Sequence, residues 1–342
     1  MKSDLIKKIE EIISNQTADE SELILQLMSL LQEADSKSGI TEETKSISSL
    51  GAENLTKLKS SSPGVNLIKT GLSRFDNLLG GFTLGELVVI GGRPAMGKTV
   101  LLCNLALNIS IHTPLLYITL DLPESTLTKR MISTITNIEI SKLMHPDLSD
   151  TEKEVLGDAE STLSKYKIYI NDSRHDSLAE LRSYCQKQIE ENGVKVIMLD
   201  YLQMMNSKEA SIRHLKVGSF IHELKKISRD FNVCVIAASQ LSRFVEFRGG
   251  DKRPQLSDLK DSGSIEEHTD KVIFMYRPEY YQIAVDEDGI STEGTTELIV
   301  AKNRNGRLGT IKLKRNVNFT KFKTFDGYSQ EFNFQIRRPH DN

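Results

Sequence analysis

Residues 86–99 read Glu-Leu-Val-Val-Ile-Gly-Gly-Arg-Pro-Ala-Met-Gly-Lys-Thr, an apolar run followed by a glycine-rich loop. Residues 86–91 are typical of a short buried strand, and a helix is predicted over residues 98–111. The loop at 92–99 matches GxxxxGK[ST], a pattern that is specific for phosphate binding when a strand precedes it and a helix follows. The stretch therefore predicts an α/β nucleotide-binding fold, the alternative being a chance match in a structural loop.

The residues of this loop suit the binding of ATP or GTP. Its glycines let the backbone wrap close to the phosphates, and the start of the next helix adds the positive end of its dipole. Lys98 is expected to reach the β- and γ-phosphates, and the Thr99 hydroxyl to ligate Mg²⁺. ATP and Mg²⁺ are the cofactors that this site implies. The predicted nucleotide-binding residues are Gly92, Arg93, Pro94, Ala95, Met96, Gly97, Lys98 and Thr99.

Beyond the loop, apolar runs alternate with amphipathic stretches. The runs predict further strands at residues 115–119, 167–170, 194–199, 233–237, 271–276, 296–301 and 310–314. Helices are predicted over 124–136, after Ser177 and across 217–227. Repeated strand–helix–strand units with near-continuous apolar strands predict a mainly parallel twisted sheet with helices on both faces. The turn at 303–308 contains Gly306, so the last two strands are expected to form a C-terminal hairpin.

Composition divides the chain into four parts. Two amphipathic stretches predict a short helical N-terminal arm at residues 1–34. Residues 35–64 are rich in Ser, Thr, Lys and Glu and predict a linker with at most one weak helical turn. Residues 65–326 are expected to form the ATPase domain. Residues 327–342 form a tail that either packs as a last strand, lacks structure or binds a partner.

The composition also narrows the class of protein. The 342 residues are 38% hydrophobic and 27% charged, as in an ordinary soluble domain. No run of about 18 apolar residues occurs, and the first residues do not resemble a signal peptide, so we expect a cytoplasmic protein with no membrane partner. Cys103, Cys185 and Cys234 lie far apart in apolar surroundings, which favours buried, reduced thiols and argues against a zinc site.

The net charge of −3 is unevenly distributed along the chain. Residues 1–60 carry seven Lys and Arg against eleven Asp and Glu, whereas six basic residues and no acidic one lie from Lys302 to Arg315. The basic stretch suits a phosphate-facing surface, but a solvated pair of strands explains it equally well.

Three polar residues follow apolar strands at the edge where open α/β sheets bind their ligands. Asp200 follows four apolar residues and is predicted to hold Mg²⁺ together with Thr99, the alternative being a helix cap. Asp121 is predicted to orient the attacking water, although it could instead cap the next helix. Gln240 could sense the γ-phosphate or lie in a solvated loop.

Several blocks of sequence are more specific than the phosphate loop alone. They are GGRPAMGKT at 91–99, VIMLDYLQMM at 196–205, IAASQLSR at 236–243, KRPQLSDLKDSGSIEEHTD at 252–270 and AKNRNGRLGTIKL at 301–313. Few other ATPases combine the last two blocks. The chain from about Gly71 to Phe325 therefore resembles the RecA-type motor domain of the DnaB family of replicative hexameric helicases. The resemblance implies a RecA-like P-loop NTPase core.

This resemblance assigns roles that composition leaves open. In such helicases a Lys and an Arg of the hairpin project into the neighbouring subunit's ATP site. They correspond to Lys302 and Arg304, with Arg304 as the arginine finger that stabilises charge on the transferring phosphoryl group. Other family residues line a central channel and grip the backbone of one DNA strand, so binding should tolerate any sequence and weaken with salt. The implied DNA-binding residues are Lys260, Asp261, Gly263, Arg213 and Lys216.

Two features depart from the family pattern. The family usually has a Glu where Asp121 stands, and the shorter side chain retracts the carboxylate by about 1 Å, so we expect slow but real hydrolysis. The long N-terminal domain that recruits primase in typical members is expected to be missing, with only the acidic residues 1–60 ahead of the motor.

The sequence thus favours an ATP-dependent helicase that moves on single-stranded DNA, 5′ to 3′ by resemblance, as a ring-shaped homo-oligomer. A hexamer is expected, with a helicase loader or primase as further partners. The alternative is an ATP-dependent DNA-binding loader or scaffold with weak hydrolysis. Asp121 favours this alternative, whereas the Lys302 and Arg304 pair argues against it. A recombinase or clock-type ATPase is disfavoured by the 252–270 block.

Overall fold

The computed structural model describes residues 46–60, 67–145, 147–173, 177–202, 213–259, 262–287 and 289–324. The chain divides into two units between Val65 and Asn66. The arm predicted at 1–34 and the tail predicted at 327–342 lie outside the described residues.

Helix α3 (Ile47–Ser60) is the described helix of the first unit. It begins at a serine cap, because the Ser46 hydroxyl accepts a hydrogen bond from the Ser49 backbone N–H at 3.2 Å. Its 14 residues are longer than the single weak turn expected within the linker at 35–64. The sequence signal is weak because the helix has few large apolar residues to mark a buried face, and the side chains of Ile47 and Leu55 are exposed.

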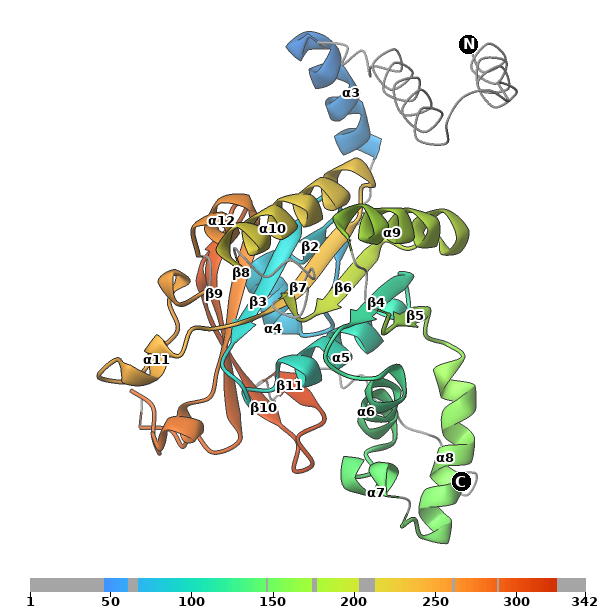
Figure 1. Cartoon of the computed structure of the whole chain (residues 1–342), viewed down its shortest axis with the longest axis vertical. Helices are drawn as coiled ribbons and strands as arrows, with labels where there is room; N and C mark the ends of the chain where they lie inside the picture. The colour runs from blue at the N-terminus through green and yellow to red at the C-terminus, as the bar shows by residue number, and fades with distance from the viewer. Residues whose placement is uncertain are drawn as a thin grey trace, which may run out of the picture. The chain divides into compact units, whose positions relative to one another are not determined.

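A nine-stranded sheet forms the centre of the second unit (Figure 1). Its strands are β3 (Leu87–Gly92), β4 (Leu115–Thr119), β5 (Ile168–Asn171), β6 (Val196–Asp200), β7 (Cys234–Gln240), β8 (Lys271–Tyr276), β9 (Thr295–Asn303), β10 (Gly309–Arg315) and β11 (Phe322–Thr324). They lie in the order β11-β10-β9-β8-β3-β7-β6-β4-β5. The strands from β8 to β5 in this order are parallel, and β9, β10 and β11 continue the sheet antiparallel. The predicted mainly parallel sheet and its C-terminal hairpin are confirmed.

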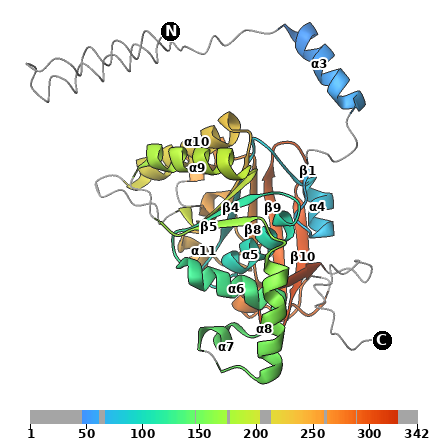
Figure 2. The same cartoon turned by 90° about the vertical axis from the view of Figure 1, so that its right-hand side faces the viewer.

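Helices cover both faces of this sheet (Figure 2). They are α4 (Ser73–Leu79), α5 (Lys98–Ser110), α6 (Glu124–Thr136), α7 (Ile140–Met144), α8 (Asp150–Leu163), α9 (Leu178–Asn192), α10 (Arg213–Asp230), α11 (Phe244–Phe247) and α12 (Ser262–His268). Val88 and Ile90 of β3 belong to the core that contains α5, whereas Leu87 and Val89 belong to the core that contains α10 and α12. This alternation follows from the two-residue period of a strand that is buried on both faces.

Smaller elements complete the second unit. β1 (Leu67–Ile68) and β2 (Phe82–Thr83) form a separate two-stranded sheet, and two 3₁₀ turns occur at η2 (Leu256–Asp258) and η3 (Pro278–Tyr281). The pattern of apolar residues did not predict α7 and α8. Helix α8 buries little more than Ala159, so its sequence lacks an apolar stripe. Its capping box, Ser149 with Glu152, was the available signal.

Cys103, Cys185 and Cys234 are buried and free, as predicted. Within the part of the chain that the structure describes, no helix combines the length and apolarity that a membrane span requires.

Candidate active site

The phosphate-binding loop joins the end of β3 to the start of α5. Ala95 and Gly97 adopt left-handed backbone conformations, with φ angles of 63° and 96°. A Cβ atom on Gly97 would lie 2.8 Å from the Phe319 ring. Position 97 therefore requires glycine twice over, for its backbone conformation and for the close approach of Phe319.

The Lys98 ammonium lies over this loop. It donates hydrogen bonds to the carbonyl oxygens of Gly92 at 2.8 Å and Arg93 at 3.0 Å. Burial lowers the pKa of Lys98 to about 8, and the charge of Asp200 opposes this shift. Phosphate oxygens are charged and accept stronger hydrogen bonds than carbonyls do, so this ammonium is placed to exchange loop carbonyls for phosphate.

Arg93 anchors the loop from behind. Its Nε donates to the Glu246 carboxylate at 2.8 Å, and its Nη1 donates to the Leu241 carbonyl at 3.0 Å. These contacts connect the loop to α11 and to the residue after β7. Arg93 thus holds the shape of the loop.

Asp200 lies at the carboxyl end of β6 and is 3% exposed. Burial raises the pKa of Asp200, while hydrogen bonds from the Thr99 and Tyr117 hydroxyls favour its charged form. The Tyr117 hydroxyl donates to Oδ2 at 3.2 Å. The structure therefore brings together Thr99 and Asp200, as predicted, and adds Tyr117.

A cavity of about 470 Å³ lies over the loop and has the size of a small-molecule site. Lys98, Thr99, Asp121, Asp200 and Gln240 all line it. Gln240 reaches the cavity because β7 pairs with β3 in a register that sets it opposite Gly92. Of the predicted loop residues, Pro94, Ala95, Gly97, Lys98 and Thr99 line the cavity, whereas Gly92, Arg93 and Met96 do not.

Sequence reasoning missed one wall of this cavity. Arg130 and Thr134 of α6 and the segment Asn318–Thr320 line it. Phe319 is held by the guanidinium groups of Arg277 and Arg315, which lie 4.6 and 5.4 Å from its ring centroid. Tyr117 could have been found from strand parity. It lies two residues before Thr119, which pairs with Asp200, so both side chains are on one face.

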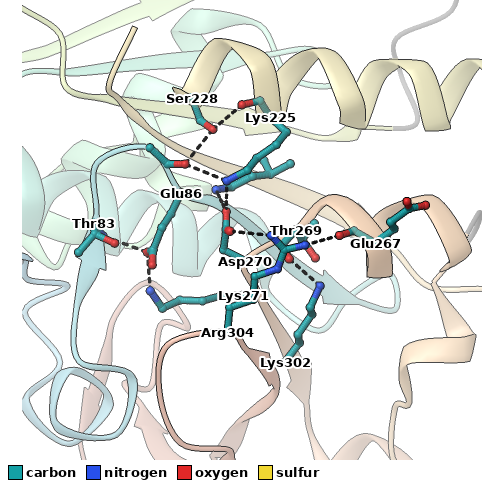
Figure 3. Close-up of polar contacts among 12 residues, drawn as sticks. Thr83, Glu86, Lys225, Ser228, Glu267, Thr269, Asp270, Lys271, Lys302 and Arg304 are labelled. Atoms are coloured by element: carbon teal, nitrogen blue, oxygen red, sulfur yellow. Dashed lines mark hydrogen bonds and ion pairs between the residues drawn. The ribbon is translucent and has the colours of Figure 1, made fainter. Parts of the chain in front are cut away.

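Lys302 and Arg304 lie away from this cavity, at the other end of the sheet (Figure 3). β9 is antiparallel to β8, and Asn303 at its end pairs with Lys271 at the start of β8. The hairpin turn therefore lies beside the amino ends of the parallel strands, whereas the phosphate loop follows their carboxyl ends. The six residues of β3 alone span about 20 Å.

Both cations contact the carboxyl end of α12. Lys302 donates to the carbonyl oxygens of Glu266 and, at 2.6 Å, of Thr269. Arg304 donates to the carbonyl of Glu267, and its Nη1 lies 3.5 Å from the Asp270 carboxylate. Positive charge is favourable at this end of a helix. The Arg304 side chain remains 45% exposed.

The predicted DNA-binding residues are only partly described. Lys260 and Asp261 lie outside the described residues. Arg213 and Lys216 fall in the first turn of α10. Gly263 is an exposed residue of α12, and a Cβ atom added to it would meet nothing within 4 Å.

The donors at the cavity suit Mg²⁺. The Thr99 hydroxyl and the Asp200 carboxylate are hard oxygen ligands in mutual contact. No group of three or more His, Cys, Asp or Glu among the described residues could hold a metal by itself. Mg²⁺ is commonly bound through one or two protein groups together with substrate phosphates, so the residues present fit this ion.

Comparison with known proteins places the fold and the family. The "DnaB-like helicase C terminal domain" family model matches residues 67–324. A solved helicase-type ATPase domain is 29% identical, with a TM-score of 0.75 over 83% of this chain and all of that chain. A solved DnaB-like replicative helicase, studied for its interactions with primase, is 28% identical, with a TM-score of 0.77 over 95% of this chain and 76% of that chain. The predicted RecA-like α/β core is confirmed.

Curated relatives agree with this placement. A probable replicative DNA helicase of Trieres chinensis is 39% identical over 271 residues, 78% of this chain and 59% of the relative. The replicative DNA helicase DnaC of Bacillus subtilis is 34% identical over 274 residues, 79% of this chain and 59% of the relative. The chain thus spans about three fifths of the length of these relatives. It belongs to the family of DnaB-like helicase C-terminal domains.

Proposed function

We propose that this protein is an ATP-driven DNA helicase that moves along single-stranded DNA as a ring, hydrolysing each ATP between two subunits. The relatives' names and the family support helicase activity. The observation that carries the shared site is the separation of Arg304 from the cavity lined by Lys98. Since the two lie at opposite ends of one sheet, a finger at Arg304 serves the site of another subunit.

Within one subunit, the cavity binds the nucleotide. Lys98 leaves the carbonyls of Gly92 and Arg93 and binds the β- and γ-phosphates. Asp121 orients the attacking water, and Gln240, beside the loop, contacts the γ-phosphate and responds to its loss. These roles extend the positions of the side chains on the cavity wall.

Thr99 and Asp200 are the residues that would hold Mg²⁺. The bound ion supplies positive charge to the phosphate oxygens during phosphoryl transfer. Tyr117 keeps the Asp200 carboxylate oriented toward Thr99 through its hydrogen bond.

The neighbouring subunit completes the site. Arg304 stabilises negative charge on the transferring phosphoryl group, and Lys302 adds a second cation beside it. Such a supply in trans makes hydrolysis depend on assembly, for which a hexameric ring is our proposal. The exposed guanidinium of Arg304 is consistent with a contact to another subunit.

DNA binds on the side of α12 and of the first turn of α10. We assign phosphate contacts to Lys260, Asp261 and Gly263, and to Arg213 and Lys216. Residues 65–326 act as the motor, 1–34 as an arm joined by the linker 35–64, and 327–342 as a tail. A helicase loader or a primase is the further partner that this function calls for.

The comparisons do not favour the alternative of a loader or scaffold with weak hydrolysis. The curated relatives at 39% and 34% identity are both named as replicative helicases. No contact in the described part of the chain singles out a loader.

One preparation can test the proposal. Hydrolysis of ATP that single-stranded DNA stimulates, together with displacement of a strand from a forked duplex, is the expected result. Lys98→Ala serves as the control that loses both activities. DNA binding that needs ATP but proceeds without turnover or strand displacement would reject the helicase and favour the loader.

A further inference from the structure

A buried carboxylate joins the strand of the phosphate loop to the hairpin that carries Arg304. Asp270, just before β8, is 6% exposed. Its Oδ2 accepts hydrogen bonds from the Leu87 N–H at 2.7 Å and the Lys225 ammonium at 2.6 Å. Its Oδ1 faces the Nη1 of Arg304 at 3.5 Å (Figure 3). One side chain thus contacts β3, α10 and the hairpin.

The backbone of Asp270 fixes the same elements. The Asp270 N–H donates to the Leu87 carbonyl at 2.8 Å, and the Arg304 N–H donates to the Asp270 carbonyl at 2.9 Å. The main chain of Arg304 is therefore held against Asp270, whichever way its guanidinium points.

Three cations gather around this carboxylate at the end of α12. Lys225 and Arg304 contact Asp270, while Lys302 contacts helix carbonyls nearby. The adjacent carboxylate of Glu86 is engaged by Lys271 instead. Asp270 consequently balances the charge of Lys225 and Arg304, which would otherwise repel each other in a partly buried place.

The two contacts of Asp270 differ in strength. Lys225 is mostly buried, with a side chain 17% exposed, and its ion pair is short. Arg304 is 45% exposed, and its contact is at the limit of hydrogen-bond length. Asp270 is thus held firmly by Lys225 and restrains Arg304 loosely, which leaves most guanidinium donors free for another anion.

We propose that Asp270 is a positioning residue for Arg304. It directs the guanidinium from the hairpin toward the nucleotide of the neighbouring subunit, and Lys225 keeps the carboxylate in place. This inference rests on the proposed function, in which Arg304 acts in trans. Asp270 does not line the cavity of its own subunit, so its effect on turnover passes through the finger.

Asp270→Asn tests the role of the charge. The amide oxygen can still accept the Leu87 N–H, but the attraction to both cations is lost. We expect kcat for DNA-stimulated hydrolysis to fall by about 10²-fold, as for a misplaced catalytic group. KM for ATP should stay within about twofold, because the phosphate loop is untouched. Combining Asp270→Asn with Arg304→Ala should lower kcat no further than Arg304→Ala alone, and independent, multiplying losses would overturn the proposal.

Mixed rings separate finger positioning from support of the phosphate-loop strand. Asp270→Asn subunits mixed with Lys98→Ala subunits should regain activity, since intact loops then meet intact fingers. Asp270→Asn mixed with Arg304→Ala should not, because both lack a working finger. The reverse pattern would show that Asp270 acts on its own loop through Leu87, and the positioning role would be wrong.

Glu86→Gln is the matched control. It removes another buried carboxylate charge at the same end of the sheet, one that pairs with Lys271 and does not contact Arg304. It should leave kcat near the wild-type value even if it lowers stability. Full activity of Arg304→Ala itself would reject the shared site of the proposed function. A reduced Arg304→Ala whose loss multiplies with that of Asp270→Asn would reject only the positioning role.

Discussion

Asp121 lines the nucleotide cavity with Lys98 and Asp200, and its charge acts on both of those groups. We expect Asp121→Asn to abolish DNA-stimulated ATP hydrolysis, with a loss of at least about 10²-fold, because an amide cannot take up a proton from water. Asp121→Glu should raise the rate, since the longer side chain brings the carboxylate about 1 Å closer to the phosphate. Steady-state turnover at saturating ATP measures both effects.

Glu124 provides the control for this prediction. It is the first residue of α6, three positions along the chain from Asp121, and it does not line the cavity. Glu124→Gln should therefore keep wild-type turnover. If Asp121→Asn hydrolyses ATP normally, Asp121 is not the group that orients water.

The three thiols make a second prediction about single residues. Burial raises the pKa of Cys103 and of Cys185 to about 12, and raises that of Cys234 further. Native thiols should therefore stay neutral and unreactive toward a disulfide reagent at pH 8, and all three should react in denaturant. Unfolded thiols have a pKa of 9.0, so between pH 9 and about 12 the unfolded chain loses protons that the native chain keeps. Stability should fall across that window, and urea midpoints at pH 8 and pH 10 measure the trend.

At the scale of elements, the phosphate loop and the segment around Phe319 depend on each other. Gly97→Ala introduces strain at a positive φ and a contact at 2.8 Å with the Phe319 ring. We expect it to cost about 2 to 4 kcal/mol of unfolding free energy, from backbone strain and overpacking together, and to weaken ATP binding. Chemical denaturation and a nucleotide titration measure the two losses.

Gly80→Ala isolates the backbone contribution. Gly80 has a φ of 74°, and a Cβ atom there would meet nothing within 4 Å. Its replacement should cost only about 1 to 2 kcal/mol, the strain of a left-handed residue. Adding Phe319→Ala to Gly97→Ala should relieve the contact but not the strain. Equal costs for Gly80→Ala and Gly97→Ala would mean that Phe319 does not constrain the loop.

Elements whose burial leaves a pattern were predictable from the sequence. The strand that ends at Gly92 and the one that ends at Asp200 are continuous apolar runs, because helices cover both of their faces. Helix α8 escaped prediction because it packs at the edge with little apolar surface. Phe319 escaped because no local pattern reveals that a residue more than 200 positions away approaches Gly97.

At the scale of the whole molecule, the sheet separates two halves of one chemistry. The loop that binds phosphate is at the carboxyl ends of the parallel strands, and Arg304 is at their amino ends. The position of Arg304 relative to the cavity could not be derived from spacing, since it depends on β9 being antiparallel to β8. In the proposed function, a subunit alone binds ATP without completing the site, so the nucleotide itself should favour assembly.

Assembly in the presence of Mg²⁺ and a non-hydrolysable ATP analogue tests this coupling. The wild-type protein should form its ring at lower protein concentration with the analogue than without it. Arg304→Ala should need about tenfold more protein, because a charge-assisted hydrogen bond of about 1.5 kcal/mol is lost at each interface. Arg307 is an exposed arginine on the same turn, so Arg307→Ala removes an equal charge and should assemble like the wild type. Sedimentation velocity over a concentration series decides the matter. Equal weakening by both substitutions would assign the effect to the charge of the turn, and no weakening by Arg304→Ala would remove the finger from the interface.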